Sequence, residues 1–293
     1  MNDTPHTVVS IGALTSVGQI REHNEDDYII IPDVVDTELR EGENSFVLGR
    51  GGCFLAVADG MGGAAAGEVA SQATTQFIKR FLVANKYSNP TPIEIKHVFE
   101  QLVVQCHQNL QKIIQHNAEY KGMGTTIVMA WVLDYTAYIC WVGDSRCYHF
   151  RQSQGTILAT EDHSWVMEMV KKGHLTFDQA ANHEYRNIIT QCIGDSEHPP
   201  KPDFVSIKLE KGDKILLCSD GLNTMITDPE IHRHLSQTVN LNLTMQQLIA
   251  AANQAGGEDN VTVAMLEFLE KPTQNNGRKT KNSVWSKFKN LFK

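Results

Sequence analysis

Aspartates stand directly at the ends of apolar runs in this chain, and no other feature constrains the fold as strongly. The runs in question cover residues 54–58, 138–142 and 214–219. Each is of strand length, and an acid closes it: Asp59 and Asp220 follow at once, and Asp144 follows after Gly143. A buried strand that ends on a carboxylate brings a charged oxygen to the rim of a hydrophobic core. Hard cations such as Mg²⁺ and Mn²⁺ bind oxygen ligands of this kind.

Two further acids precede predicted strands instead of following them. Asp26 and Asp259 each come two residues before a run rich in β-branched or aromatic side chains. In an antiparallel pair the start of one strand lies beside the end of its neighbour, so Asp26 can meet Asp59. Asp259 can meet Asp220 in the same way, if their two strands pair antiparallel. Five carboxylates that are far apart in the sequence could thus collect along one edge of a sheet structure.

Like charges gathered in this way repel each other, and a bound cation is the simplest compensation. The alternative is that the acids serve turns only, because Asp-Gly is a common turn sequence. Residues 59–63 read Asp-Gly-Met-Gly-Gly, so little side-chain bulk surrounds the first carboxylate. Backbone carbonyls of this stretch are therefore also available as oxygen ligands.

Composition places the chain among soluble globular proteins. It has 293 residues, of which 41% are hydrophobic, and this is enough for a substantial core. No apolar run approaches the length of a membrane span, and residues 1–6 show no secretory signal. The six cysteines lie mostly inside apolar runs without a Cys-X-X-Cys pair, which predicts buried reduced thiols and a cytoplasmic protein.

The charge of the chain is unevenly distributed. The formal net charge is −8, but residues 278–293 hold six basic residues and no acid, so the remainder carries −14. An acidic body argues against general nucleic-acid binding and is compatible with bound divalent metals.

Periodicity predicts an α+β protein. Two long helices are predicted over 64–87 and from Pro92 to about residue 117, the second with Thr91 as its N-cap. Shorter helices are predicted at 228–236 and 244–254, and 33–52 reads as a loop. Besides the run before Asp59, strands are predicted at 8–17, 26–31, 126–133, 137–143, 146–151, 203–209, 214–218 and 261–268. The three strands between 126 and 151 read as an antiparallel meander, and the whole order predicts two packed sheets with helices outside.

Arg21 lies five residues before the strand-starting Asp26. An arginine at this distance can bring a planar fork of donors to a metal cluster, and phosphate is the usual ligand of an arginine beside metals. The spacing alone leaves open the alternative of an exposed arginine paired with Glu22 or Glu25.

Six short motifs follow one another along the chain. They are Arg21-X-X-Asn24-Glu25-Asp26, Ala58-Asp59-Gly60-Met61-Gly62-Gly63, Gly122-Met123-Gly124-Thr125-Thr126, Gly143-Asp144-Ser145-Arg146, Ser219-Asp220-Gly221 and Glu258-Asp259-Asn260. This ordered set resembles that of the metal-dependent serine/threonine protein phosphatases of type 2C, the PPM family, over residues 8–268. The bacterial branch is the closer likeness, through Asp-Gly-Met-Gly-Gly and residues 183–190.

The resemblance implies a four-layer α/β/β/α sandwich of two antiparallel sheets flanked by helices, with a metal centre at one end. The catalytic domain would span residues 1–270 and hold two Mn²⁺ or Mg²⁺ ions, with a third and weaker ion beside them. By this resemblance, Asp59 would bridge two ions, Asp220 and Asp259 would complete the first site, and the Gly60 carbonyl would bind the second ion. Glu25 and Asp26 would act as ligands through water. Asp144 together with Asp220 would hold the third ion, and Arg21 would bind phosphate.

The implied reaction is hydrolysis of phosphoserine and phosphothreonine in proteins. A water that bridges two cations is deprotonated near neutral pH and attacks phosphorus in line, so no covalent phosphoenzyme is needed. Met61 stands where eukaryotic members of the family often carry a histidine that protonates the leaving oxygen. A metal-bound water is then the expected acid, with His163 and His183 as alternatives.

Residues 163–198 correspond, in the resemblance, to the flap that borders the cleft of bacterial members. His163, His183 and Arg186 of this segment could meet a phosphopeptide, although a solvated loop also explains them.

The last residues of the chain form two further segments. Residues 271–277 read as a linker, and 278–293 read as a basic amphipathic tail. The tail repeats apolar residues at helical spacing among lysines, namely Val284, Trp285, Phe288, Leu291 and Phe292. A helix of this kind suits an anionic membrane surface or a groove on a partner protein. A disordered tail and a helix docked back on the acidic body are the alternatives.

We therefore expect a metal-dependent phosphatase that acts on phosphoproteins and opposes a serine/threonine kinase of the same cell. A catalytically silent phosphoprotein-binding scaffold is the main alternative, and retention of the acids and of Arg21 argues against it. A regulator-specific phosphatase in an anti-sigma or secretion-control switch would differ in substrate and not in chemistry. We expect a cytoplasmic monomer, with contact to the inner face of the membrane only through residues 278–293.

Overall fold

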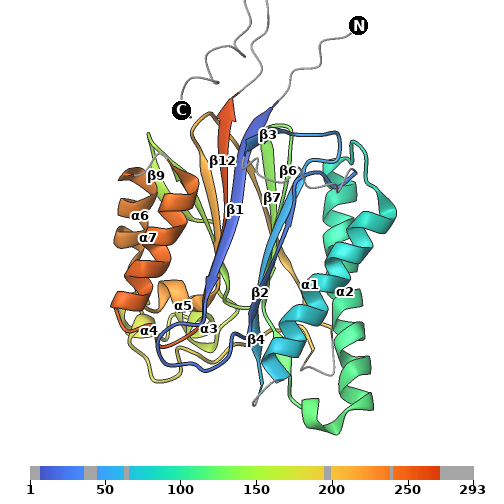
Figure 1. Ribbon diagram of the computed structural model, residues 1–293. Coiled ribbons are helices and arrows are strands. Elements are labelled where there is room, and N and C mark those ends of the chain that lie inside the picture. Colours follow the sequence, from blue (N-terminus) through green and yellow to red (C-terminus); the bar gives the residue numbers. More distant parts are fainter. Residues whose placement is uncertain (1–6, 36–44, 63–65, 195–198, 238–239, 271–293) are drawn as a thin grey trace, which may run out of the picture.

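Two antiparallel sheets, packed face to face, form the middle of the molecule (Figure 1). The computed structural model describes residues 7–35, 45–62, 66–194, 199–237 and 240–270. The first sheet has the order β3 (Ser45–Val47), β1 (Val8–Ser16), β12 (Val261–Glu270), β11 (Lys214–Cys218), β8 (Arg146–Arg151) and β9 (Gly155–Leu158). The second has the order β10 (Asp203–Lys208), β7 (Thr136–Val142), β6 (Ile127–Leu133), β4 (Cys53–Met61) and β2 (Asp26–Ile31), with β5 (Gly124–Thr125) paired to β4.

Helices cover the outer face of each sheet (Figure 1). The long helices α1 (Ala66–Asn85) and α2 (Pro92–His116) flank the second sheet, and α6 (Asp228–Gln237) and α7 (Leu241–Gln254) flank the first. Short elements complete the described chain, namely a 3-10 turn (Ala118–Tyr120), α3 (Trp165–Lys171), α4 (Phe177–Ala181) and α5 (Asp220–Asn223). The expected four-layer α/β/β/α sandwich is therefore confirmed.

The start of α2 follows from its sequence. Thr91 has extended backbone angles, and its side chain accepts a hydrogen bond from the backbone N–H of Glu94. The Glu94 carboxylate in turn accepts from the Thr91 N–H, which completes a capping box, and Pro92 occupies the first turn. The predicted N-cap is thus confirmed.

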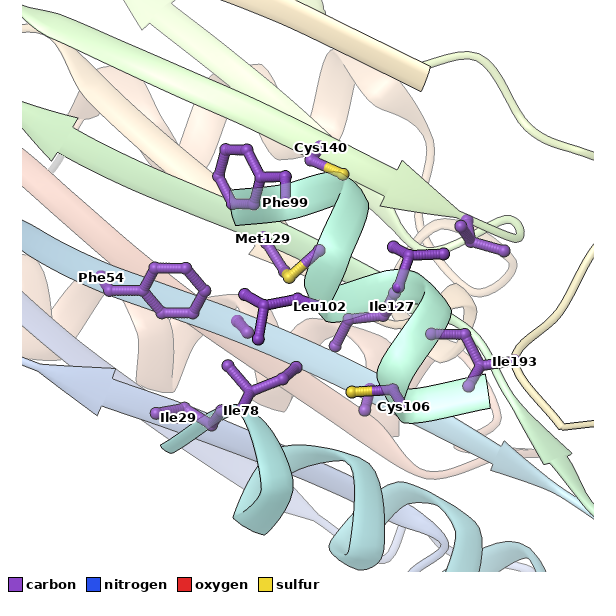
Figure 2. Packing of buried hydrophobic residues seen from close by; sticks show 14 of the residues in the cluster. Ile29, Phe54, Ile78, Phe99, Leu102, Cys106, Ile127, Met129, Cys140 and Ile193 are labelled. Carbon is purple, nitrogen blue, oxygen red and sulfur yellow. The ribbon is translucent and has the colours of Figure 1, made fainter. Parts of the chain in front are cut away.

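Strand β4 is buried on both of its faces. Phe54, Ala56 and Ala58 belong to the apolar cluster beneath α1 and α2, where Figure 2 shows Phe54 among side chains of both helices and of the sheet. Leu55 and Val57 belong to the cluster between the two sheets. A strand buried on both faces needs no polar alternation, which explains why residues 54–58 form a continuous apolar run.

The strand β8 differs from the prediction. β6 and β7 pair with each other, but β8 pairs with β11 and β9 in the other sheet. The chain crosses between the sheets at Gly143, whose φ of +104° suits glycine. The predicted meander is therefore wrong for its third strand, because the apolar pattern of β8 fits either sheet. The predicted loop at 33–52 also contains β3.

Two findings bear on the wider expectations. All six cysteines are buried and unbridged, as predicted. In the part of the chain that the structure describes, no helix has the length and apolar character required to cross a membrane. The expected linker and tail, 271–293, and the last residues of the expected flap, 195–198, lie outside the described residues.

Candidate metal centre

The strand ends bring the predicted acids together. In the β2–β4 pair, Asp26 lies directly opposite Asp59, and the backbone N–H of Gly60 donates to the Glu25 carbonyl over 3.0 Å. β11 and β12 pair antiparallel, so Asp220 after one strand and the acid before the other share the same edge. Both antiparallel neighbours were predicted from the sequence, and both are confirmed.

Asp26 is the most deeply buried of these acids, with 7% of its surface exposed. Its Oδ2 accepts a 2.7 Å hydrogen bond from the Ser219 hydroxyl, whereas its buried Oδ1 has no partner among the described residues. The pKa of Asp26 is raised to about 7, chiefly by burial; the charges of Asp220 and Asp259 add to the rise, and hydrogen bonds to the carboxylate oppose it. A buried carboxylate oxygen without a hydrogen-bond partner fits the part of a cation ligand.

Asp59, Asp144 and Asp220 share this electrostatic environment. Burial raises the pKa of Asp59 well above its usual range, and the charges of Asp26, Asp220 and Asp144 add to the effect. Burial likewise raises the pKa of Asp144 and of Asp220, each reinforced by a neighbouring carboxylate. Carboxylates that disfavour one another's charge fit a divalent cation, which would supply the missing positive charge. The donor set, all oxygen, suits Mg²⁺ or Mn²⁺.

The acids do not form a closed cage for one ion. Among the described residues, no group of three or more His, Cys, Asp or Glu side chains is already arranged to hold a single metal. Carboxylates spread along a sheet edge instead leave much of each ion's coordination to other oxygens, and magnesium in particular usually keeps several waters.

Arg21 contacts two of the acids. Its Nη2 lies 2.8 Å from Asp259 Oδ2, and its Nη1 lies 3.9 Å from Glu25 Oε2. The Arg21 side chain remains 47% exposed. The pairing with Glu25 was one expected alternative, and the stronger contact with Asp259 was not expected. The guanidinium fork therefore lies at the solvent side of the acidic cluster.

Two threonines fix the backbone of Asp59. The Asp59 N–H donates to Thr126 Oγ1 over 3.2 Å, and Thr125 Oγ1 donates to the Asp59 carbonyl over 2.9 Å. Thr126 Oγ1 also shares a 2.6 Å hydrogen bond with Ser145 Oγ, next to Asp144. The motif at residues 122–126 thus links two of the acid-bearing turns.

The glycines after Asp59 and Asp220 are required by close backbone packing. A Cβ on Gly60 would lie 2.0 Å from the carbonyl oxygen of Gly67, and one on Gly221 would lie 2.0 Å from that of Asn260. Neither space admits a side chain, so the Asp-Gly pairs serve more than turns.

Asn260 organises the loop that carries Glu25, and sequence reasoning did not assign it a role. Its Oδ1 accepts from the Glu25 N–H over 2.7 Å, and its Nδ2 donates to the carbonyls of Val17 and His23. The signal was its place directly after Asp259 in the last motif.

Arg146 is a second residue without a predicted role. Its guanidinium donates to both Asp162 oxygens, over 2.9 and 2.7 Å, and to the Tyr148 hydroxyl over 3.2 Å. Asp162 faces the acidic cluster and raises the pKa of Asp144 and of Asp220, and Arg146 opposes this rise. The pair therefore limits the negative charge beside the site.

The three predicted flap residues are placed differently from one another. His163 is only 7% exposed and both of its ring nitrogens are engaged, a geometry that does not favour the expected contact with a substrate. His183 is partly exposed and packs against Trp165 and Tyr185. Arg186 is exposed.

Comparison with known proteins agrees with this geometry. The family model described as Protein phosphatase 2C matches residues 43–255. The chain belongs to the protein phosphatase 2C family. It is a serine/threonine protein phosphatase of bacterial type, and its catalysis is metal-dependent.

Relatives and solved structures resemble the phosphatase over nearly its whole described length. It is 35% identical to Protein phosphatase PhpP of Streptococcus pneumoniae over 266 residues, which is 91% of this chain and all of PhpP. The serine/threonine phosphatase of S. agalactiae is 34% identical with a TM-score of 0.78, covering 89% of this chain and all of that one. The catalytic domain of PstP, solved with two manganese ions, is 26% identical with a TM-score of 0.72, covering 90% of this chain and all of that domain.

Proposed function

We propose that the acids at this sheet edge hold two Mn²⁺ or Mg²⁺ ions, with a third and weaker ion beside Asp144. The phosphatase hydrolyses phosphoserine and phosphothreonine in proteins. One observation carries the proposal. Asp26 lies directly opposite Asp59 in the β2–β4 pair, and its buried Oδ1 has no hydrogen-bond partner among the described residues. The manganese ions of the PstP structure support it.

Each acid would take a defined part in this centre. Asp59, at the middle of the cluster, would bridge the two ions, with Asp220 and Asp259 on one and the Gly60 carbonyl on the other. Glu25 and Asp26 would bind through water. When bound, the ions supply a Lewis acid and an activated water for direct attack on phosphorus. Thr125 and Thr126 keep Asp59 in place during the reaction.

Arg21 would bind the phosphate group of the substrate. Its fork contacts Asp259, and a phosphate competes for the same donors because two of its oxygens can accept both N–H groups of the fork. Because the Arg21 side chain is half-exposed, its guanidinium can turn from the Asp259 carboxylate to a phosphate without leaving a buried position.

The proton for the leaving oxygen would come from water. Met61 has no proton to donate, and the buried His163 uses both ring nitrogens in hydrogen bonds. His183, whose ring is partly exposed, remains the alternative acid from the flap.

Hydrolysis of a phosphothreonine peptide with EDTA, Mg²⁺ or Mn²⁺ tests the metal centre. We expect EDTA to abolish turnover and either ion to restore it, with Asp220→Asn needing more metal than the wild type. Activity that survives EDTA and the substitution contradicts the two-metal proposal. A wild type that stays inactive with every ion would instead favour the phosphoprotein-binding scaffold.

Partners and location belong to the same proposal. A serine/threonine kinase of the same cell would supply the substrates, and a single regulator of an anti-sigma or secretion switch is the narrower variant. We propose a cytoplasmic monomer whose body, residues 1–270, carries catalysis and whose tail, 278–293, contacts an anionic membrane or a protein groove. A chain ending at Glu270 should then leave the membrane fraction of a lysate, and an unchanged distribution contradicts the role of the tail.

A further inference from the structure

The flap segment, defined here as residues 163–194, is tied to the body at its first residue. The buried His163 accepts a 3.1 Å hydrogen bond at Nδ1 from the N–H of Gly143, and its own N–H donates to the Gly143 carbonyl. Its Nε2 faces Asp203 at 3.4 Å, and its ring stacks on Trp141. The N–H of Thr190, near the other end of the flap segment, donates to the His163 carbonyl over 2.7 Å.

A second buried histidine ties down the last residue of the flap segment. His107 of α2 is 4% exposed, and its Nδ1 accepts a 3.2 Å hydrogen bond from the N–H of Gly194. Gln111, one turn further along α2, donates to the Gly194 carbonyl. Ile193 and Thr125 exchange two backbone hydrogen bonds, of 2.9 and 2.8 Å. The two ends of the flap segment thus have the same kind of anchor.

Both anchors act on glycines with fixed geometry. Gly143 and Gly194 have φ values of +104° and +110°, and a Cβ on Gly143 would lie 2.6 Å from the Thr126 side chain. A side chain is therefore disfavoured at both positions. A ring nitrogen that accepts an N–H carries no proton, and burial lowers the pKa of His107, which favours this neutral form.

Each anchor is connected, through the chain or through hydrogen bonds, to a turn that carries an acid of the metal centre. Gly143 precedes Asp144 in the chain, and Thr125 donates its hydroxyl proton to the Asp59 carbonyl. We propose that His163 and His107 are positioning residues, which hold the two ends of the flap segment at a fixed distance from the turns that carry Asp144 and Asp59. The flap segment, which a phosphoprotein substrate would contact, thereby keeps a fixed position relative to the metal centre. Only this last step rests on the proposed function.

Matched substitutions of each histidine test the proposal in the full-length chain. Asparagine places an amide oxygen near the position of Nδ1, whereas glutamine extends its amide toward that of Nε2. We expect His163→Gln and His107→Gln to speed amide hydrogen exchange at Gly143 and Gly194 by about tenfold or more, because a buried N–H loses its acceptor. The asparagine variants should keep most of the protection, and His174→Gln, at an exposed flap histidine, should change neither site.

The kinetic readout separates positioning from simple stability. With Mn²⁺, the glutamine variants should lower kcat/KM for a phosphothreonine peptide about 10- to 100-fold while largely keeping hydrolysis of p-nitrophenyl phosphate, which is too small to span the flap. Parallel losses on both substrates, in proportion to the folded fraction, would overturn the proposal. Equal exchange in the asparagine and glutamine variants would also overturn it.

The exchange measurement is made without metal as well as with Mn²⁺. It therefore reports on the two anchors even if the wild type proves inactive with every ion. Inactivity would remove the proposed function, whereas unchanged exchange in the glutamine variants would remove the anchors.

Discussion

The two ends of β11 carry two aspartates that have opposite electrostatic environments. Asp213 precedes the strand and is fully partnered: it accepts from His149 and Arg151 side chains and from the Glu210 N–H. Burial alone raises the pKa of Asp213, but these hydrogen bonds outweigh it and lower the value to about 2. Asp220 follows the same strand, and there burial and the charge of Asp259 raise the pKa.

The difference shows how one strand serves two purposes. At the Asp213 end, the carboxylate has a counter-charge and hydrogen-bond donors within the protein, so its charged form is stabilised without a cation. At the Asp220 end, carboxylates face carboxylates, so the arrangement costs stability until a cation binds. Carboxylates that lack counter-charges within the protein therefore indicate the functional site.

Exchanging one carboxylate for an amide, once in the acidic cluster that includes Asp220 and once at Asp213, gives the largest effect that this comparison predicts. Asp59→Asn should lower kcat by about 10³-fold or more, because several kcal/mol of transition-state stabilisation depend on the ions that it would bridge. Asp213→Asn should leave the kcat of folded enzyme unchanged and lower the free energy of unfolding by about 2 to 3 kcal/mol. Steady-state kinetics and urea unfolding measure the two quantities.

The metal dependence of unfolding completes this test. Mn²⁺ at about 100 times its Kd should add about 2.7 kcal/mol to the unfolding free energy of the wild type and of Asp213→Asn. The same addition should have little effect on Asp59→Asn. An equal response in all three proteins would break the distinction between the two ends.

Asn260→Ala should weaken the acidic end without removing a ligand. Three hydrogen bonds to the loop at residues 17–25 are lost, and we expect a 10- to 100-fold loss of metal affinity or activity. Asn240→Ala removes the side-chain cap of α7 and should cost about 1 kcal/mol of stability with normal kinetics. Isothermal titration with Mn²⁺ compares the two variants, and equal affinities would show that Asn260 serves stability alone.

The last prediction concerns pH at the partnered end. The pKa of Asp213 is about 2 when folded and about 3.9 when unfolded, so its carboxylate adds stability above the unfolded value and loses it as pH falls through the folded one. The advantage of the wild type over Asp213→Asn should be full at pH 5 and shrink steadily between pH 4 and 2. Urea unfolding at several pH values measures it, and a constant difference would contradict the assignment.

The acids were predictable because each is next to a strand in the sequence. The antiparallel rule then placed Asp26 opposite Asp59, and the structure confirms this register. The same rule could not assign β8 to its sheet, because both faces of that strand are buried in either place. It also could not show that His163 is enclosed, since its partners Gly143, Thr190 and Asp203 come from three separate segments.

Most strands, the long helices and the acids at the strand ends could be located from the sequence, because they depend on the spacing of neighbouring residues. Which charges have partners depends instead on contacts between distant segments. Asp213 and Asp220 both flank the same apolar run, and the spacing of neighbouring residues does not tell which of the two has counter-charges. The pKa of Asp213 is lowered because side chains from distant segments, such as Arg151, donate hydrogen bonds and supply positive charge. The pKa of Asp220 is raised because it is buried near the carboxylate of Asp259.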